Sequence, residues 1–188
     1  MKPKPMLMYT ALLVLALTLA ACGSDQPVDD GWTTYQSPQG LSFEIPQDWA
    51  VEEGDGVVTL ASSPEALDSG DLNGAAGASI THATIDDFEG SNDTAIILDL
   101  FIDFFDSGTA ELEQISPPGP TTIQGQTGST VSYRGIVSEQ DGLYTATVIA
   151  NDTRLALILS IDGSTDERYA ADLERVVNSL QMIERVTE

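Results

Sequence analysis

The sequence predicts an α+β fold, a mainly antiparallel β-sheet with helices packed on it. Short segments that alternate apolar and polar residues recur along the chain, as half-buried strands do. Glycine-rich and Asp-Gly turns separate several of these segments, which favours antiparallel hairpins. Two longer segments place apolar residues at helical spacing, and such helices bury that face against a sheet.

The N-terminal residues are typical of a bacterial secretory signal. Lys2 and Lys4 precede an apolar stretch from Met6 to Ala21. This stretch is shorter than the roughly 20 apolar residues that a transmembrane helix needs, so a permanent transmembrane anchor is less favoured. We therefore predict a signal-peptide helix over residues 1–21, which is removed from the mature protein.

A single cysteine follows this signal. Leu19-Ala20-Ala21-Cys22 resembles the lipobox of bacterial lipoproteins, which implies cleavage between Ala21 and Cys22 and a lipid on the Cys22 thiol. The small residues admit the peptidase, and the thiol can carry a diacylglyceryl group as a thioether. An ordinary signal peptide with a chance cysteine is the alternative. The resemblance predicts a lipid-anchored protein on the outer face of a membrane, at the cell surface or the outer membrane.

The chain after the signal is strongly acidic and forms one predicted domain. A polar tether covers residues 22–31, and a single globular domain covers 32–188. Loss of the two signal lysines changes the formal net charge from -23 to -25. Such a domain is repelled by nucleic acid, so no nucleic-acid partner is expected. The charge suits cationic partners or metal ions, although a solvated acidic surface is the favoured interpretation.

Four strands are predicted in the first half of the domain, at residues 32–35, 41–45, 57–61 and about 78–85. Pro38 and Gly40 form a turn between the first two strands, and Pro46 ends the second. The small and glycine-rich segment 69–77 predicts a mobile loop.

A helix is predicted over about residues 92–107, with Ser91 as its N-cap. Its polar positions fall on one narrow stripe: Asn92, Asp99, Asp103 and Asp106. The remaining wide apolar arc predicts burial on most sides or a surface offered to a partner. Core packing is the favoured alternative.

The second half is rich in predicted strands. A loop at residues 116–120 precedes strands at 130–137 and 143–150, and Asp141-Gly142 between these strands indicates a hairpin. The strand 154–161 is apolar on both faces, which predicts a central place in the sheet. The last helix is predicted to begin with a capping box formed by Ser164 and Glu167. One face of this helix is apolar: Tyr169, Leu173, Val176, Val177, Leu180 and Ile183.

Two short motifs resemble a known family. The segment Phe43-Glu44-Ile45-Pro46-Gln47-Asp48-Trp49, after an aromatic strand and a Gly turn, resembles the opening of PsbP-like domains, and Val177-Asn178-Ser179-Leu180 resembles their terminal helix. The resemblance implies an α-β-α sandwich. Photosynthetic members of the family are non-catalytic extrinsic subunits that stabilise a metal cofactor assembly. Fold does not transfer function, and Trp49 is expected to be a core side chain.

The sequence contains no recognisable catalytic set. His82 is the sole histidine, the mature domain has no lysine, and Cys22 would be acylated. Nucleophile-elbow, phosphate-loop and dinucleotide motifs are absent. We therefore predict no catalytic residue, no enzymatic activity and no cofactor. A hydrolase with an unusual site around His82 is an alternative that the sequence leaves open.

Calcium is the metal that best suits this acidic composition. Residues 68–74 superficially resemble the start of an EF-hand loop, but Ile80 occupies the position that requires a bidentate glutamate. We therefore predict no metal site. A transition-metal site is disfavoured because the chain offers one imidazole.

The leading functional hypothesis is a non-enzymatic, lipid-anchored adaptor or accessory subunit of the cell envelope. Its expected partners are the membrane, through lipidated Cys22, and an envelope protein. The alternative is a module that binds a divalent cation such as calcium, or a small ligand.

Overall fold

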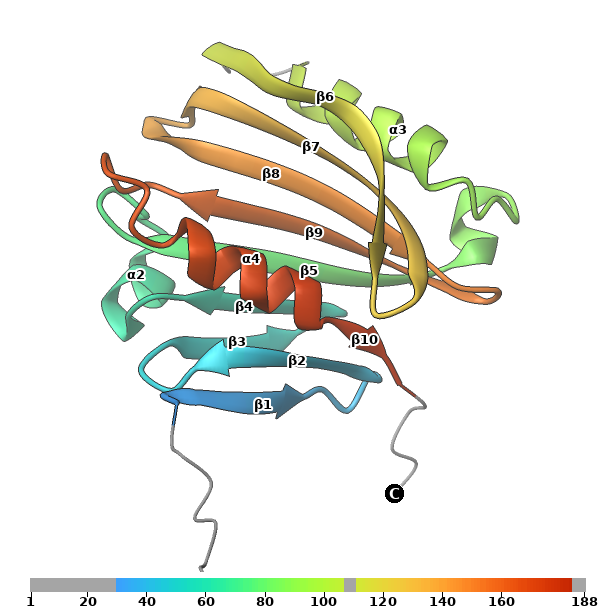
Figure 1. Cartoon of the computed structure of the whole chain (residues 1–188), viewed down its shortest axis with the longest axis horizontal. Coiled ribbons are helices and arrows are strands. Elements are labelled where there is room, and N and C mark those ends of the chain that lie inside the picture. Colours follow the sequence, from blue (N-terminus) through green and yellow to red (C-terminus); the bar gives the residue numbers. More distant parts are fainter. Residues whose placement is uncertain (1–29, 107–110, 184–188) are drawn as a thin grey trace, which may run out of the picture. The chain divides into compact units, whose positions relative to one another are not determined.

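The structure is a computed structural model that describes residues 30–106 and 111–183, with only the backbone described at 103–106 (Figure 1). All of these residues except Asp30 fall in one compact unit, Gly31–Glu188. The predicted signal helix, the lipobox with Ala21 and Cys22, and nearly all of the tether lie outside the described residues. Within the described part, no helix is both long and apolar enough to span a membrane.

Seven antiparallel strands form the large sheet of this unit, which confirms the predicted fold class. Their order is β3 (Ala50–Gly54), β4 (Val57–Ala61), β5 (Ala76–Thr84), β9 (Arg154–Asp162), β8 (Gln140–Ala150), β7 (Gln126–Val137) and β6 (Glu111–Ile123). β9 occupies the middle of this order, as its apolar faces predict. Leu155, Ala156 and Ile158 are fully buried there, on both faces of the strand.

A small sheet lies beside the large one. It consists of β1 (Trp32–Gln36), β2 (Leu41–Pro46) and the short β10 (Gln181–Met182), with β2 in the centre. The alternation of Leu41, Phe43 and Ile45 in β2 buries all three side chains, each at most 3% exposed. The turn before β2 needs Gly40, whose φ is 88°. The first two predicted strands are therefore confirmed.

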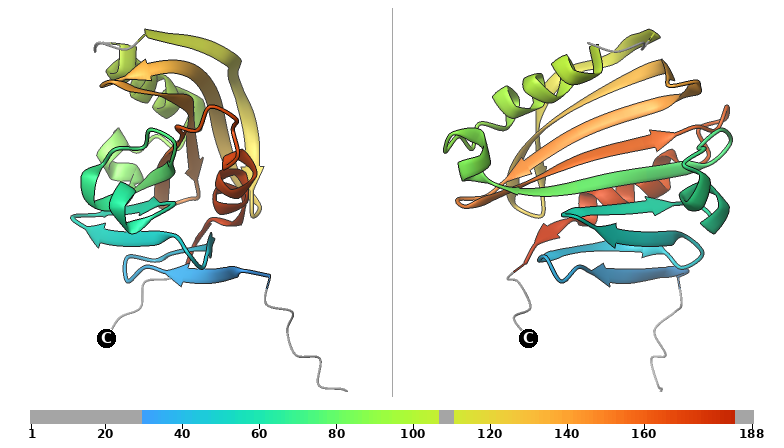
Figure 2. Two further views of the ribbon diagram at one scale, coloured as in Figure 1. Left: turned by 90° about the vertical axis from the view of Figure 1, so that its left-hand side faces the viewer. Right: turned by 180° about the vertical axis from the view of Figure 1, so that it is seen from behind.

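Two helices cover opposite faces of the large sheet, as Figure 2 shows edge-on. α4 (Ala170–Ser179) lies on one face and also contacts β2, whereas α3 (Thr94–Asp106) packs on β7 and β8 from the other face. This arrangement gives the layers of an α-β-α sandwich. The short α2 (Pro64–Ser69) and the 3-10 turn η2 (Ile85–Phe88) connect strands.

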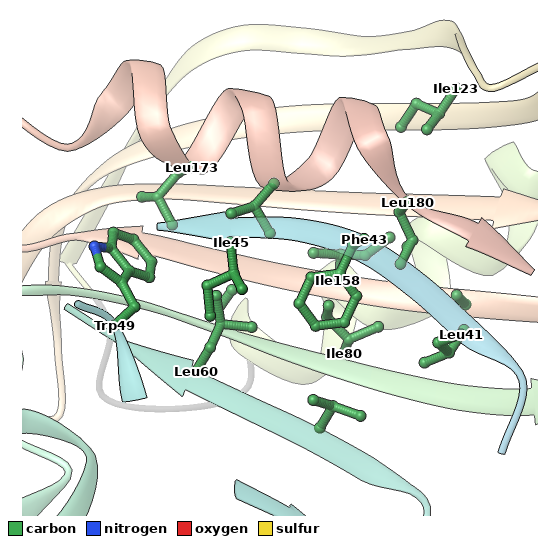
Figure 3. Close-up of a cluster of buried hydrophobic side chains, with 14 of the residues drawn as sticks. Leu41, Phe43, Ile45, Trp49, Leu60, Ile80, Ile123, Ile158, Leu173 and Leu180 are labelled. Carbon is green, nitrogen blue, oxygen red and sulfur yellow. The ribbon is translucent and has the colours of Figure 1, made fainter. Parts of the chain in front are cut away.

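The larger core cluster fills the space between the two sheets and α4 (Figure 3). Phe43 from β2 shares this cluster with Leu173 and Val176 of α4 and with Leu180, which follows the helix. The apolar face predicted for the last helix is therefore confirmed except at Ile183, because the helix ends at Ser179 and β10 follows it. Trp49 is 9% exposed and packs edge-on against Tyr169, with ring centroids 6.1 Å apart. Trp49 is therefore a core side chain, as expected.

The second core cluster lies under α3. Ile97 and Leu98 of the helix are buried against Val131 of β7 and Val148 of β8. The start of the helix is fixed by a hydrogen bond of 2.8 Å between the buried hydroxyls of Thr94 and Ser129. This cluster is almost wholly aliphatic.

The loop predicted at residues 116–120 is wrong, because this segment belongs to β6. β6 is an edge strand whose pairing with β7 has register shifts between Gln114 and Ser116 and between Ser116 and Gly119. An edge strand tolerates proline, since the missing N–H faces away from the neighbouring strand. Pro117, Pro118 and Pro120 therefore lie within an edge strand and do not interrupt it.

The predicted hairpin between β7 and β8 is confirmed, but its turn was placed wrongly. The turn residues are Ser138 and Glu139, both with positive φ, at 52° and 70°. Positive φ at both central residues is the pattern of a type I′ turn. Asp141 and Gly142 lie within β8, where a Cβ on Gly142 would come within 2.8 Å of the Asp162 carbonyl oxygen. Close strand packing, not the turn, requires this glycine.

The predicted N-cap of α3 is also wrong. The helix begins at Thr94, and the Asp93 carboxylate accepts the Ala95 amide at 3.1 Å. Ser91 instead accepts the Asp93 amide at 3.2 Å, one step before the helix. Asp93 thus performs the capping role that the sequence assigned to Ser91.

The capping box predicted for α4 does not form. α4 begins at Ala170, several residues after Ser164 and Glu167, and Glu167 pairs with Arg134 of β7. The Asp162 carboxylate accepts the Tyr169 amide at 3.1 Å instead. A carboxylate at the end of β9 therefore orders the chain that enters the helix.

Four short elements were not predicted: β3, α2, η2 and β10, the last of which occupies residues that were expected to be helical. The segment expected as a loop at 69–77 is shorter than predicted, since α2 runs to Ser69 and β5 begins at Ala76. α2 has both a Ser63 cap on the Ala66 amide and a left-handed Gly70 at its end.

Candidate functional sites

The outer face of α3, formed by Ala95, Ile96, Asp99 and Leu100, is the first candidate site. Ile96 and Leu100 are 54% and 59% exposed and lie one helical turn apart. The prediction that the apolar arc of this helix is buried on most sides is wrong for these two residues. Ile97 and Leu98 occupy the sheet side, so Ile96 and Leu100 are left on the side away from it.

Acidic side chains accompany this apolar face. Asp93 and Asp99 are exposed on and before the helix, and Asp86, Asp87 and Glu89 are exposed at η2 just upstream. The sequence from Ile85 to Asp106 contains no lysine or arginine. The pKa of Asp87 is lowered chiefly because its carboxylate accepts the Thr84 amide, then the Thr84 hydroxyl, with a smaller contribution from nearby His82. This segment is therefore apolar and anionic together.

A cleft between α4 and the large sheet is the second candidate site. It has a volume of about 290 Å³. The floor comes from β6, β7, β8 and β9, and the roof from α4. Its lining residues are Thr121, Ile123, Thr130, Leu143, Thr145, Thr147, Ser160, Asp162, Ala170, Leu173, Glu174, Val177 and Asn178. Figure 3 shows Ile123 and Leu173, which take part in the neighbouring core and also line the cleft.

Hydroxyl groups dominate the floor of the cleft, in rows across neighbouring strands. The Thr130 and Thr147 hydroxyls lie 2.9 Å apart, and the Thr130 hydroxyl also reaches the Ala146 carbonyl at 3.2 Å. The Ser160 hydroxyl donates to the Thr145 carbonyl at 3.3 Å. These bonds use the hydroxyl protons and leave oxygen lone pairs as acceptors.

Asp162 closes one end of the floor. It is 1% exposed, and its carboxylate accepts the amides of Ser164 at 2.9 Å and of Tyr169 at 3.1 Å, together with the Ser164 hydroxyl. Glu174, one residue after Leu173 on α4, is exposed at the cleft. The residues that line the cleft include no lysine, arginine or histidine.

His82 and the EF-hand-like segment, which the sequence offered for catalysis or metal binding, belong to neither candidate site. His82 lies in β5, partly buried and close enough to Asp87 to affect the carboxyl pKa. In the EF-hand-like segment, Asp71 accepts the Asn73 amide at 2.9 Å within a local turn, and Ile80 is a core residue of β5. Across residues 30–106 and 111–183, no three His, Cys, Asp or Glu gather where they could hold a metal ion.

The cleft was not predicted from the sequence. Its signal was the alternation of hydroxyl residues at Thr130 and Ser132, at Thr145 and Thr147, and at Ser160. One face of three adjacent strands is polar although their other face is apolar, and a buried sheet face is normally apolar. The gap between the helix and the sheet could not be read from this pattern, because it depends on where α4 lies.

Comparison with known proteins shows the fold. No family model and no curated relative matches the chain. Among solved structures, it is similar to the solution structure of cyanobacterial PsbP (CyanoP) from Synechocystis sp. PCC 6803, with 18% identity, a TM-score of 0.55, and coverage of 86% of this chain and 98% of that chain.

Two further structures have the same architecture. LpqN, which is involved in cell envelope biogenesis of Mycobacterium tuberculosis, matches with 12% identity, a TM-score of 0.53, and coverage of 81% of this chain and 91% of its own. A Pseudomonas aeruginosa protein of unknown function, a putative regulator, matches with 12% identity, a TM-score of 0.50, and coverage of 83% and 99%. The described domain therefore has the PsbP-like α+β fold. These likenesses carry no functional residue across.

Proposed function

We propose that this protein is a lipid-anchored, non-enzymatic accessory subunit of the cell envelope, which binds an envelope protein through the outer face of α3. The observation that carries the proposal is the exposure of Ile96 and Leu100 on a helix whose Ile97 and Leu98 are buried in the core. Large apolar side chains that lie together on a surface are typical of interaction sites. Their acidic surroundings specify a partner segment that combines lysine or arginine with aliphatic side chains.

The lipobox and the fold support the location. Cys22 is the only thiol available for acylation, and LpqN, which has the same fold, is involved in cell envelope biogenesis. Attachment is tested by incorporation of labelled fatty acid in the native host. The full chain should be labelled and sediment with membranes, and Cys22→Ala should lose both properties. Labelling of Cys22→Ala equal to that of the unaltered chain would contradict the anchor.

The docking surface is tested by photo-cross-linking in intact cells. A photoreactive amino acid replaces Ala95, on the outer face of α3, or, as the control, Ile115, which is an exposed position of β6. The proposal predicts one discrete adduct from position 95, absent from position 115 and abolished by Leu100→Ser. The cross-linked peptide should be basic and aliphatic.

Three results would contradict this docking. Equal adducts from both positions would mean diffuse contact, and absence of any adduct would mean that the face is a solvated surface. An adduct with a second copy of this chain would replace the basic partner with self-association. The non-enzymatic role itself would be contradicted by a reproducible enzymatic turnover that a single point substitution in the domain abolishes.

A second function, binding of a small ligand, is favoured by the cleft under α4. A volume of about 290 Å³ is near the lower limit for ligand pockets in proteins. The calcium form of this alternative has no comparable support, since the described residues bring no ligand cluster together. Thermal melts with calcium or sodium chloride titrated separately distinguish these cases, because saturable binding raises stability at low concentration whereas screening follows ionic strength.

A further inference from the structure

The Asp162 carboxylate is a buried acid for which the described residues show no ion pair with a basic side chain. It is 1% exposed, and the groups that donate to it are two backbone amides and one hydroxyl, all uncharged. Buried charges in proteins are normally paired or bound to a cation, because their desolvation is costly. No lysine, arginine or histidine is among the residues that line the cleft.

The rest of the cleft is built for a hydrogen-bond donor with an aliphatic part. The hydroxyls of Thr130, Thr147 and Ser160 already donate or pair among themselves and with carbonyl oxygens, so they chiefly offer lone pairs. Apolar contact comes from Leu143 on the floor and from Leu173 and Val177 on the α4 roof. The ammonium group of an aliphatic amine supplies hydrogen-bond donors and positive charge together, and the alkyl chain of the amine can contact these apolar side chains.

We propose that the cleft under α4 binds a small aliphatic amine, with the ammonium group directed to Asp162 and the hydroxyl floor and the alkyl chain against Leu173 and Val177. This inference rests on the second function above, small-ligand binding, and names its ligand class. An anion would meet Asp162 and Glu174 without a compensating positive charge. A bare metal ion would leave most of the cleft unfilled, and no three His, Cys, Asp or Glu of the described residues gather to hold one.

The test uses three probes that share one carbon chain and differ in charge: putrescine, butanediol and succinate. Each is titrated calorimetrically into the full chain in a neutral detergent, at constant ionic strength, with calcium chloride as a control for diffuse attraction. Putrescine should bind saturably and at one site. Butanediol should bind at least tenfold more weakly, and succinate should not bind.

Matched variants locate the binding. Glu174→Gln removes a charge at the cleft and should weaken putrescine binding by about two- to fivefold, the range of an exposed ion pair. Thr147→Val removes a floor hydroxyl and should weaken it by up to about tenfold. Asp172→Asn removes a charge from the same helix outside the cleft lining and should leave binding unchanged. All three positions avoid Asp162, whose replacement would also disturb the approach to α4.

Each other outcome overturns the inference. Equal binding of putrescine and butanediol would retain a small-ligand site but reject the cationic class. Equal weakening of putrescine binding by Glu174→Gln and Asp172→Asn would show that putrescine is attracted to the acidic surface as a whole. Displacement of putrescine by calcium at matched charge would show the same. Absence of saturable binding by any probe would reject both this inference and the second function.

Discussion

The two faces of one set of strands differ sharply in this domain. Along β8, Thr145 and Thr147 face α4, whereas Ala146 and Val148 face α3. The α3 side is an aliphatic core in which Ile97 and Leu98 are buried. The α4 side changes from an apolar core near β2 to a floor of hydroxyls with a cleft above it.

From this difference we infer that the α3 side of these strands chiefly stabilises the fold and that the cleft on the α4 side is available to a ligand. Burial of aliphatic side chains stabilises a sheet face through the hydrophobic effect. A polar face on the same strands gains less in this way, so we attribute its hydroxyl groups to ligand binding. On the α3 side the proposed binding surface lies outside, on the face of the helix that points away from the sheet. On the α4 side the proposed binding site lies inside, between the helix and the sheet.

The largest effect is expected in the core under α3. Leu98→Ala removes a side chain that is 0% exposed, and such truncations typically cost about 2–5 kcal/mol. Urea unfolding followed by circular dichroism measures the loss. A loss below about 1 kcal/mol would mean that the α3 side is loosely packed, and the contrast between the faces would fail.

A smaller effect is expected where α4 meets the small sheet. The Arg175 guanidinium stacks on Trp32, 4.1 Å from the ring centroid, and donates to Glu44 at 2.7 Å. Both partners of the ion pair are about 40% exposed, at 39% and 42%, so solvent screens the pair. Arg175→Ala should therefore cost about 1 kcal/mol of unfolding free energy. Arg175→Lys should restore only part, since lysine lacks the planar stacking group.

A pH effect should arise at β1, outside both faces. Partial burial, followed by a hydrogen bond to Glu53 and the charge of that residue, raises the pKa of Tyr35 to about 12 from 10.0. The unfolded chain loses this proton first, so stability is intact below pH 10 and falls as pH rises toward about 12. Tyr35→Phe should flatten this decline in unfolding experiments. An unchanged decline would assign it to other groups.

The smallest effect is expected on the outer face of α3. Leu100→Ser removes a side chain that is 59% exposed, so the unfolding free energy should change by no more than about 0.5 kcal/mol. The same variant should abolish cross-linking from position 95. A loss comparable to that of Leu98→Ala would show that Leu100 belongs to the core, and the docking surface would have no basis.

The sequence predicted those features that depend on local periodicity. β2 followed from the alternation of apolar and polar residues, β9 from a run that is apolar on both faces, and the apolar face of α4 from helical spacing. The connection predicted between β7 and β8, residues 138–142, contains the turn at Ser138 and Glu139, but it is longer than the turn that forms. The turn signal was assigned to Asp141-Gly142 because neither Ser138 nor Glu139 favours positive φ. Ser91 and Ser164 were assigned as caps because a serine suits that role. The Asp93 carboxylate caps α3 instead, whereas α4 has no side-chain cap and Asp162 only accepts the amide of Tyr169 before the helix.

The candidate sites were harder to predict, since each depends on tertiary placement. The sequence showed that α3 has an apolar arc wider than one packing face, but not that Ile96 and Leu100 would be the uncovered part. The alternating hydroxyls of β7 and β8 were visible, but the cleft requires α4 to stand off from them. The lipid-anchor prediction at Cys22 lies outside the described residues and stays a prediction.

The most direct test of the contrast is the unfolding free energy of two neighbouring variants of β8, Thr147→Val and Val148→Thr. Both side chains are buried, Thr147 at 2% exposure on the floor of the cleft and Val148 at 0% in the core under α3. Urea unfolding should show a loss of about 1–3 kcal/mol for Val148→Thr, because a hydroxyl is buried without a partner. Thr147→Val should change stability by less than about 1 kcal/mol. Equal losses in the two variants would contradict the account, because the hydroxyl floor would then be a structural network and not a surface available to a ligand.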